Sequence, residues 1–272
     1  MLAPLIEPQQ LSEHLGDTSL LIIDCSSEAN FLQAHIPGAV HIKPSALQCG
    51  IKPAVGKLPD QQQLSALFSG VGLTADKHVV AYDDEGGGWA GRLIWTLEVM
   101  GHSNWSYLNG GRIAWLAEQR ATESGPAENQ PSDYQASISN RYIAECDTVL
   151  SGLEQNDFAV WDARSAQEYR GEKVLAQRGG HIPGAVNIDW LDLMDPANHH
   201  RLKPLDELEQ TLSTVGLSKD KTIATHCQSH HRSGLSWLVM KLLNYPNILA
   251  YHGSWSEWGN REDTPVEQQV SP

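Results

Sequence analysis

Short apolar runs alternate with helix-like stretches along the chain. The segment Leu20-Leu21-Ile22-Ile23 is apolar throughout, which is typical of a parallel strand buried on both faces. In the C-terminal half, strands are predicted near residues 158–162, 185–188, 221–226 and 247–251, and helices near residues 165–170, 205–215, 233–243 and 254–258. Because strands that alternate with helices imply parallel crossovers, we predict α/β domains, each with a parallel sheet flanked by helices on both faces.

This pattern occurs twice. The hexapeptide His-Ile-Pro-Gly-Ala-Val is repeated without change, and each copy follows an apolar run that ends in an aspartate, Asp24 or Asp162. A Val-Gly-Leu turn followed by Asp-Lys also recurs, as does a glycine-containing turn that leads to a tryptophan. The matching segments are 35–40 and 181–186, 71–77 and 215–221, and 109–115 and 252–258. We infer one kind of domain present in two copies.

The two copies define the expected domain boundaries. The first domain is predicted at residues 1–120 and the second at residues 140–272. Residues 121–139, rich in Ser, Glu, Gln, Asn and Pro, are expected to form a linker. A chain of 272 residues is long enough for two such domains without structural metal or disulfides.

Composition excludes several kinds of partner. The chain is 40% apolar and 19% charged, as expected of a soluble globular protein. Its net charge of −14 argues against nucleic acid and anionic membranes. An anionic substrate would therefore need a local positive patch.

The four cysteines are scattered and form no Cys-x-x-Cys pair, so a reducing compartment is expected. The N-terminus has no basic segment followed by a long apolar run, and no stretch approaches 18 uninterrupted apolar residues. We therefore expect a cytoplasmic protein with neither a signal peptide nor a membrane-spanning helix. Three of the cysteines are expected to be inert: Cys25, Cys49 and Cys146.

The fourth cysteine, Cys227, carries the strongest chemical signal. It lies between a strand-like run and a helix-like run, in the loop Cys-Gln-Ser-His-His-Arg. Loop N–H groups and the positive end of the helix dipole stabilise a thiolate at such a position. Lowering a thiol pKa from about 8.5 to about 7 takes roughly 2 kcal/mol, which a helix end, loop amides and the nearby Arg232 can supply. We predict that Cys227 is a nucleophile.

The first copy lacks this nucleophile. Alignment of the copies puts Asp83 at the position of Cys227, followed by the acidic pair Asp84-Glu85. A carboxylate cannot act as a sulfur nucleophile, and an acidic loop repels an anion. The first domain is therefore predicted to be catalytically silent.

Together these motifs resemble a tandem-domain rhodanese, a thiosulfate sulfurtransferase. The likeness rests on the duplicated His-Ile-Pro-Gly-Ala turns, the single cysteine loop and the segment Gly253-Ser254-Trp255-Ser256-Glu257-Trp258. The loop is most similar to that of the bacterial subtype with Cys-Gln-Thr-His-His-Arg. The resemblance implies two rhodanese-like domains and a ping-pong reaction without a cofactor: the Cys227 thiolate takes the sulfane sulfur of thiosulfate as a persulfide and passes it to cyanide or a thiol.

The other candidate site residues surround the cysteine in sequence or occur only in the active copy. Arg232 is expected to bind the donor anion. Gln228, Ser229, His230 and His231 are expected to shape the loop and contact substrate; convergence of the loop histidines on a metal ion is not favoured. Three residues outside the loop are candidates for the wall and rim of the site: Trp190, Arg164 and Glu168.

The histidines of the two repeated turns, His35 and His181, occur in both copies. We therefore expect a structural role for them, with a hydrogen bond to the aspartate strand. Asp24 and Asp162 also occur as a pair and are expected to be structural.

Alternative functions remain open. The chain is expected to act on small sulfur donors and acceptors as a monomer, but a persulfide carrier that delivers sulfur to a partner protein is possible. A 3-mercaptopyruvate sulfurtransferase is disfavoured because Gln228 and Ser229 replace the Gly-Ser typical of that group's loop. A phosphatase or arsenate reductase is disfavoured because Cys227 and Arg232 are separated by four residues, whereas cysteine phosphatases have five.

Overall fold

The computed structural model describes residues 2–268, which form two compact units. The N-terminal unit comprises residues up to 47, 59–139 and 194–202. The C-terminal unit comprises residues 48–58, 140–193 and those from 203 onward. Each unit thus contains a short segment from the opposite half of the sequence.

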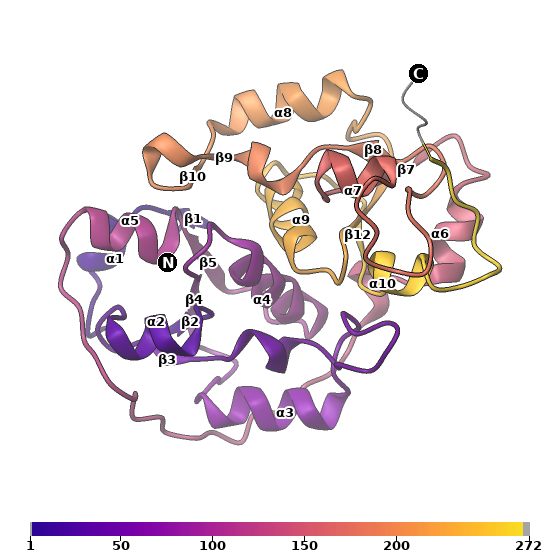
Figure 1. Cartoon of the computed structure of the whole chain (residues 1–272). Helices are drawn as coiled ribbons and strands as arrows, with labels where there is room; N and C mark the ends of the chain where they lie inside the picture. The colour runs from indigo at the N-terminus through magenta and orange to yellow at the C-terminus, as the bar shows by residue number, and fades with distance from the viewer. Residues whose placement is uncertain (1, 269–272) are drawn as a thin grey trace. The chain divides into compact units, whose positions relative to one another are not determined.

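The N-terminal unit is built on a five-stranded, fully parallel sheet (Figure 1). In spatial order its strands are β1 (Leu5–Ile6), β5 (Trp105–Leu108), β4 (His78–Tyr82), β2 (Leu20–Asp24) and β3 (Val40–His41). Its helices are α1 (Pro8–Ser12), α2 (Glu28–Gln33), α3 (Gln61–Gly70), α4 (Gly88–Val99) and α5 (Gly111–Ala117). A small antiparallel pair, β9 (Met194–Asp195) and β10 (Arg201–Leu202), also belongs to this unit.

The C-terminal unit repeats this architecture. Its parallel sheet has the order β6 (Ile143–Ala144), β12 (Ile248–Tyr251), β11 (Thr222–His226), β7 (Phe158–Asp162) and β8 (Val186–Asn187). Its helices are α6 (Cys146–Gly152), α7 (Ala166–Arg170), α8 (Leu205–Thr214), α9 (Arg232–Leu242) and α10 (Ser254–Trp258). The strand order matches that of the first sheet, so the predicted duplication and the predicted α/β fold are both confirmed.

The predicted elements of the second copy all occur, and their ends differ from the predicted ones by at most one residue. The strand predicted at 221–226 begins at Thr222, and the helix predicted at 233–243 begins at Arg232. The prediction omitted β6, α6 and the pair β9 and β10. Strands of two residues are too short to show an alternating pattern. Among the described residues, no helix has both the length and the apolar character needed to span a membrane.

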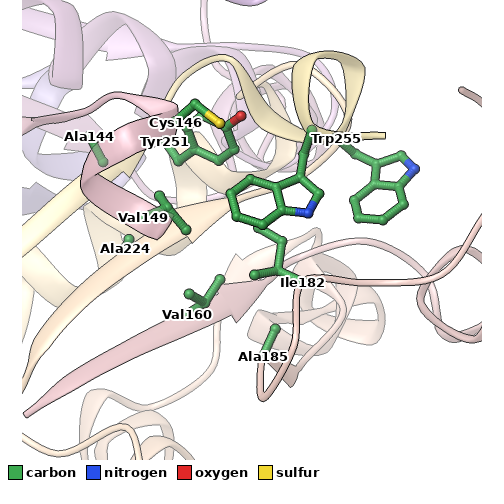
Figure 2. Packing of buried hydrophobic residues seen from close by; sticks show 10 residues of the cluster. Ala144, Cys146, Val149, Val160, Ile182, Ala185, Ala224, Tyr251 and Trp255 are labelled. Carbon is green, nitrogen blue, oxygen red and sulfur yellow. The ribbon is translucent and has the colours of Figure 1, made fainter. Parts of the chain in front are cut away.

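A buried cluster in the C-terminal unit fixes α10 against the sheet (Figure 2). Trp255 of α10 and Ile182 of the repeated turn are at most 1% exposed. Cys146 lies beside the Tyr251 ring in the same cluster, where burial raises the pKa of its thiol. The position of α10 matters because its first residues contact the cysteine loop.

The repeated turns are held by their histidines, but not through the predicted partner. His181 Nδ1 lies 2.8 Å from the carbonyl oxygen of Tyr169, and the two rings stack at 3.7 Å. His35 makes the same pair of contacts with Phe31. The prediction of a hydrogen bond to the aspartate strand is therefore wrong. The partner lies in the helix that follows the strand, because stacking of the histidine ring on Tyr169 or Phe31 brings its Nδ1 close to the backbone of that helix.

Candidate active site

The cysteine loop connects the central strand β11 to helix α9. Cys227 directly follows β11, and α9 begins five residues later, at Arg232. The carboxyl end of a central parallel strand is where α/β folds bind ligands. Cys227 itself is fully buried, so its environment is set by the protein.

The beginning of α10 braces this loop. The N–H groups of Cys227 and His230 both donate to Ser254 Oγ, at 3.3 and 3.0 Å. The backbone N–H of Trp255 donates to the carbonyl oxygen of Cys227, and that of Ser256 to the carbonyl oxygen of Gln228, each at 2.9 Å. The loop is thus held by α10 at three of its residues, Cys227, Gln228 and His230.

Ser254 is a site residue that the sequence did not reveal. Its φ of +54° lies in the left-handed region, which costs a non-glycine residue on the order of 1–2 kcal/mol. The matching residue of the N-terminal unit is Gly111, at φ +51°, where an added Cβ would lie 2.4 Å from the Asp83 carbonyl oxygen. The exchange of glycine for serine between the copies was visible in the sequence and marks the position where a hydroxyl holds the loop.

The environment lowers the pKa of the Cys227 thiol. Burial opposes ionisation, but the charge of Arg232, hydrogen bonds from the hydroxyl and amide of Ser233, and the charge of His231 together outweigh it. Ser233 supplies its amide because it lies in the first turn of α9, where backbone N–H groups have no partner within the helix. The site can therefore hold a thiolate ready for nucleophilic attack.

Arg232 is held by Glu168 in a bidentate ion pair. Arg232 Nη1 and Nη2 lie 2.7 and 2.9 Å from the two carboxylate oxygens. Glu168 is 2% exposed, while Arg232 keeps 18% of its side chain exposed. Burial opposes ionisation of Glu168, but its bonds to Arg232 and Ser165 keep the pKa of this carboxyl lowered. Glu168 thus orients Arg232. Because its own carboxylate is negatively charged, Glu168 does not attract an anionic donor directly.

Arg164 lies in the interior rather than at the rim, where the sequence placed it. It is 1% exposed and binds Asp162 through Nε–Oδ1 and Nη2–Oδ2 at 2.9 and 2.6 Å. It also donates to the carbonyl oxygen of Gly180 and lies over the Trp255 ring. A buried guanidinium with these partners packs against Trp255 of α10. The prediction rested on the presence of Arg164 in the active copy alone, which does not indicate whether its side chain points inward or outward.

The remaining candidates lie on or beside the loop. His230 is buried at φ +52°, and its Nδ1 lies 2.8 Å from Ser233 Oγ. The His231 ring lies 5.7 Å from the half-buried Trp190 ring. His226 and Asp162 face each other in the interior, at 3.5 Å, where burial lowers the histidine pKa.

Two contacts attach the loop to neighbouring segments. Gln228 Nε2 donates to the carbonyl oxygen of Leu175 at 3.1 Å. The carbonyl oxygen of Ser229 accepts from Gln48 Nε2 at 2.8 Å. In residues 2–268, no group of three or more His, Cys, Asp or Glu side chains is arranged to hold a metal ion.

The matching loop of the N-terminal unit is filled by its own carboxylate. Asp83 Oδ1 and Oδ2 accept five backbone N–H bonds, between 2.8 and 3.1 Å, from residues 85, 86, 87, 89 and 90. Five amides therefore converge on one anion in this loop. The arrangement shows that the shared fold can cradle a negative charge at the position where the C-terminal unit has a sulfur atom.

Comparison with known families agrees with the duplicated fold. The model of the rhodanese-like domain matches residues 7–118 and 145–261. The two matches together cover most of the chain, one in each half.

Individual proteins are similar over nearly the whole length. A thiosulfate sulfurtransferase of Azotobacter vinelandii is 47% identical over 96% of this chain and 96% of its own. A 3-mercaptopyruvate sulfurtransferase of Escherichia coli is 32% identical, over 94% of this chain and 95% of its own. A solved structure of EanB in complex with ergothioneine has a TM-score of 0.87 at 22% identity, covering 99% of this chain and 71% of that one; this match concerns the fold alone.

Proposed function

Because the chain belongs to the family of rhodanese-like domain proteins, we propose that it is a thiosulfate sulfurtransferase that works through a persulfide on Cys227. The observation that carries the proposal is the position of Cys227, which is buried directly after the central strand β11, in the loop that leads into α9, where the charge of Arg232 and the hydrogen bonds of Ser233 favour its thiolate. The similarity to the Azotobacter vinelandii thiosulfate sulfurtransferase supports the same donor.

In the first half-reaction, the Cys227 thiolate attacks the outer sulfur of thiosulfate. A new S–S bond forms to Cys227, the original S–S bond breaks, and its electron pair leaves with sulfite. The charge is conserved, because a thiolate and thiosulfate become a persulfide anion and sulfite. Arg232, oriented by Glu168, is the cation available to the donor, and Ser233 supplies hydrogen bonds to the sulfur of Cys227.

In the second half-reaction, cyanide or a thiolate attacks the outer sulfur of the persulfide. The Cys227 sulfur leaves as a thiolate, and thiocyanate or a new persulfide is released. Splitting one transfer into two displacements on sulfur suits a low-pKa cysteine, which is both a good nucleophile and a good leaving group. Neither step needs a redox reagent or a metal ion.

Intact-mass measurement tests this proposal. Incubation with thiosulfate should add the mass of one sulfur atom to the chain, and cyanide should remove it with formation of thiocyanate. Cys227→Ala should abolish both, whereas Cys49→Ser, which changes a half-exposed cysteine outside the loop, should still take up sulfur. Sulfur uptake by Cys227→Ala would contradict the assignment of the nucleophile.

Two alternatives give different outcomes in the same assay. A persulfide carrier would take up one sulfur atom but release it slowly to small acceptors. A 3-mercaptopyruvate sulfurtransferase, favoured by the 32% identical relative, would load faster from mercaptopyruvate than from thiosulfate. We propose thiosulfate as the better donor because the loop has Gln228 and Ser229 after the cysteine.

The setting of this reaction is also part of the proposal. The four cysteines are free in the structure, which is compatible with a reducing compartment such as the cytoplasm. We propose small sulfur donors and acceptors as the partners of a monomeric enzyme without a cofactor.

A further inference from the structure

One histidine of the cysteine loop lies in the interior. His230 is fully buried, and its Nδ1 lies 2.8 Å from Ser233 Oγ. Its backbone is in the left-handed region, at φ +52°, and its backbone N–H donates to Ser254 Oγ at 3.0 Å. The imidazole is therefore held in one place, with Nδ1 against the Ser233 hydroxyl.

Ser233 contacts the sulfur of Cys227 with two groups. Its backbone N–H and its side-chain hydroxyl both form hydrogen bonds to the sulfur, and both lower the pKa of the thiol. Ser233 lies in the first turn of α9 and is fully buried. Its hydroxyl is therefore hydrogen-bonded to two groups, the sulfur of Cys227 and Nδ1 of His230.

A hydroxyl has a single hydrogen, so it can donate to only one of these two groups. It donates to the sulfur when the histidine donates to it, which requires the proton of a neutral imidazole to be on Nδ1. With the proton on Nε2 instead, Nδ1 would accept the hydroxyl hydrogen and the thiolate would lose this hydrogen bond. The tautomer of His230 therefore decides where the Ser233 hydroxyl donates.

The N-terminal unit has the matching amide without the hydroxyl or the histidine. The amide of Ala90 donates to Asp83 Oδ2 at 3.0 Å, as the Ser233 amide does to the Cys227 sulfur. A glycine follows both Ala90 and Ser233, and residues 84–89 contain no histidine. The amide is thus common to the two units, whereas the hydroxyl and the histidine accompany the cysteine.

We propose that His230 is a positioning residue for the sulfur chemistry, because it holds the Ser233 hydroxyl with its hydrogen directed at the Cys227 sulfur. Nδ1–H of His230 donates to Ser233 Oγ, and the hydroxyl donates to the thiolate. The same hydrogen bond stabilises the thiolate as a leaving group when the persulfide gives up its outer sulfur. This second role rests on the proposed function, whereas the first requires only a thiolate.

Other charged and titratable groups lie around the cysteine and near Arg232. They are Arg232 and His231 at the start of α9, Glu168 of α7, which binds Arg232, and the buried pair His226 and Asp162 at the ends of β11 and β7. Substitutions at His230 and Ser233 alter none of these groups, so their effects are measured against an unchanged set of charges.

The pH dependence of Cys227 alkylation by iodoacetamide tests the proposal. Ser233→Ala should shift the profile to higher pH, because the thiolate loses a hydrogen bond, and His230→Leu should shift it in the same direction. The double variant should show no larger shift than Ser233→Ala alone, since the histidine acts through the hydroxyl. His230→Asn should restore most of the original profile, because asparagine has an N–H donor at the δ position and tolerates a left-handed backbone. Ser236→Ala, at another buried serine of α9, should leave the profile unchanged.

NMR of protein with nitrogen-labelled histidine reads the tautomer without any substitution. At a pH where Cys227 is ionised, His230 should carry its proton on Nδ1, and the signal is assigned by its loss in His230→Asn. A proton on Nε2 with Nδ1 bare would overturn the proposal even if His230→Leu does not fold.

Two results of the alkylation assay would also overturn it. One is an unshifted profile in a folded His230→Leu variant, and the other is a double variant in which the two single shifts add in full. Failure of the unaltered protein to take up sulfur from thiosulfate would instead refute the proposed function, because alkylation requires only the thiolate. Far-UV circular dichroism and the Tm of each variant show whether it is folded.

Discussion

At the scale of single residues, ionisation of the Cys227 thiol depends most on one cation, Arg232. Burial alone would keep the thiol protonated, and Arg232 is the largest of the effects that lower its pKa. Because Glu168 holds Arg232 with two hydrogen bonds, the guanidinium has a fixed position relative to the sulfur. The ion pair therefore helps to keep the pKa of the Cys227 thiol low.

Removing this cation should shift the pH dependence of the thiol. In Arg232→Ala the folded-state pKa of Cys227 should rise, because the largest of the effects that lower it is removed. The thiolate fraction then falls most below the new pKa and recovers above it, so the rate of alkylation by iodoacetamide should be lost at low pH and restored at high pH. Arg170→Ala, which removes an exposed arginine paired with Glu172, is the matched control.

The same variant separates two roles of Arg232. If Arg232 also binds the donor, the KM for thiosulfate should stay raised even at a pH where Cys227 is fully ionised. A KM that returns to normal at high pH would remove Arg232 from the donor site and leave it only the role of stabilising the thiolate.

At the scale of elements, the sequence predicted what periodicity and duplication make visible. Strand β11, helix α9 and the cysteine between them follow from an apolar run, a polar loop and a helical pattern. The loop candidates Gln228 to Arg232 lie where the sequence placed them because neighbours along the chain stay neighbours in space. Arg164 is not a chain neighbour of Cys227, and its predicted place at the rim was wrong. The sequence does not show whether a side chain just after a strand points inward or outward, and that of Arg164 points inward.

Contacts between segments distant in sequence could not be predicted from the same signals. Gln48 and Gly56 carry no motif, and they meet the loop only because residues 48–58 fold into the C-terminal unit. Such a contact depends on the path of the chain between elements, which neither hydrophobic periodicity nor turn chemistry specifies. Ser254 is an intermediate case: comparison of the copies showed the exchange with Gly111, but only the structure showed the two hydrogen bonds that its hydroxyl accepts from the cysteine loop.

The contact between Gly56 and the loop leads to a testable prediction. In Gly56→Ala the new Cβ cannot be accommodated at 2.3 Å from the Ser229 carbonyl oxygen, so the segment or the loop must move. We expect turnover with thiosulfate and cyanide to fall by at least tenfold and the protein to lose about 1–3 kcal/mol of stability, measured by urea unfolding. In Gly70→Ala an added Cβ meets no atom within 4 Å, so activity should be kept. Full activity of Gly56→Ala would show that the loop does not depend on this contact.

At the scale of the whole molecule, two copies of one fold hold two different anions. The strand order is the same in both sheets, and in each the residue after the central strand lies inside a ring of backbone amides or beside a helix start. In the N-terminal unit this residue is Asp83, whose carboxylate accepts five backbone N–H bonds. In the C-terminal unit it is Cys227, whose sulfur we propose gains and loses a second sulfur atom. The two units therefore differ in the group that supplies the negative charge at this position.

This difference predicts that Asp83 matters for stability and not for sulfur transfer. In Asp83→Asn one carboxylate oxygen is replaced by an NH₂ group. This group cannot accept the hydrogen bonds that backbone N–H groups donate to the carboxylate. Unsatisfied buried donors cost about 1–3 kcal/mol, so the N-terminal unit should unfold at lower urea concentration, and amides 85–90 should exchange hydrogen faster in mass spectrometry. Uptake of one sulfur atom from thiosulfate should be unchanged, because Cys227 is the only nucleophile proposed. Loss of sulfur uptake while amides 85–90 keep their protection would mean that the N-terminal unit takes part in the reaction after all.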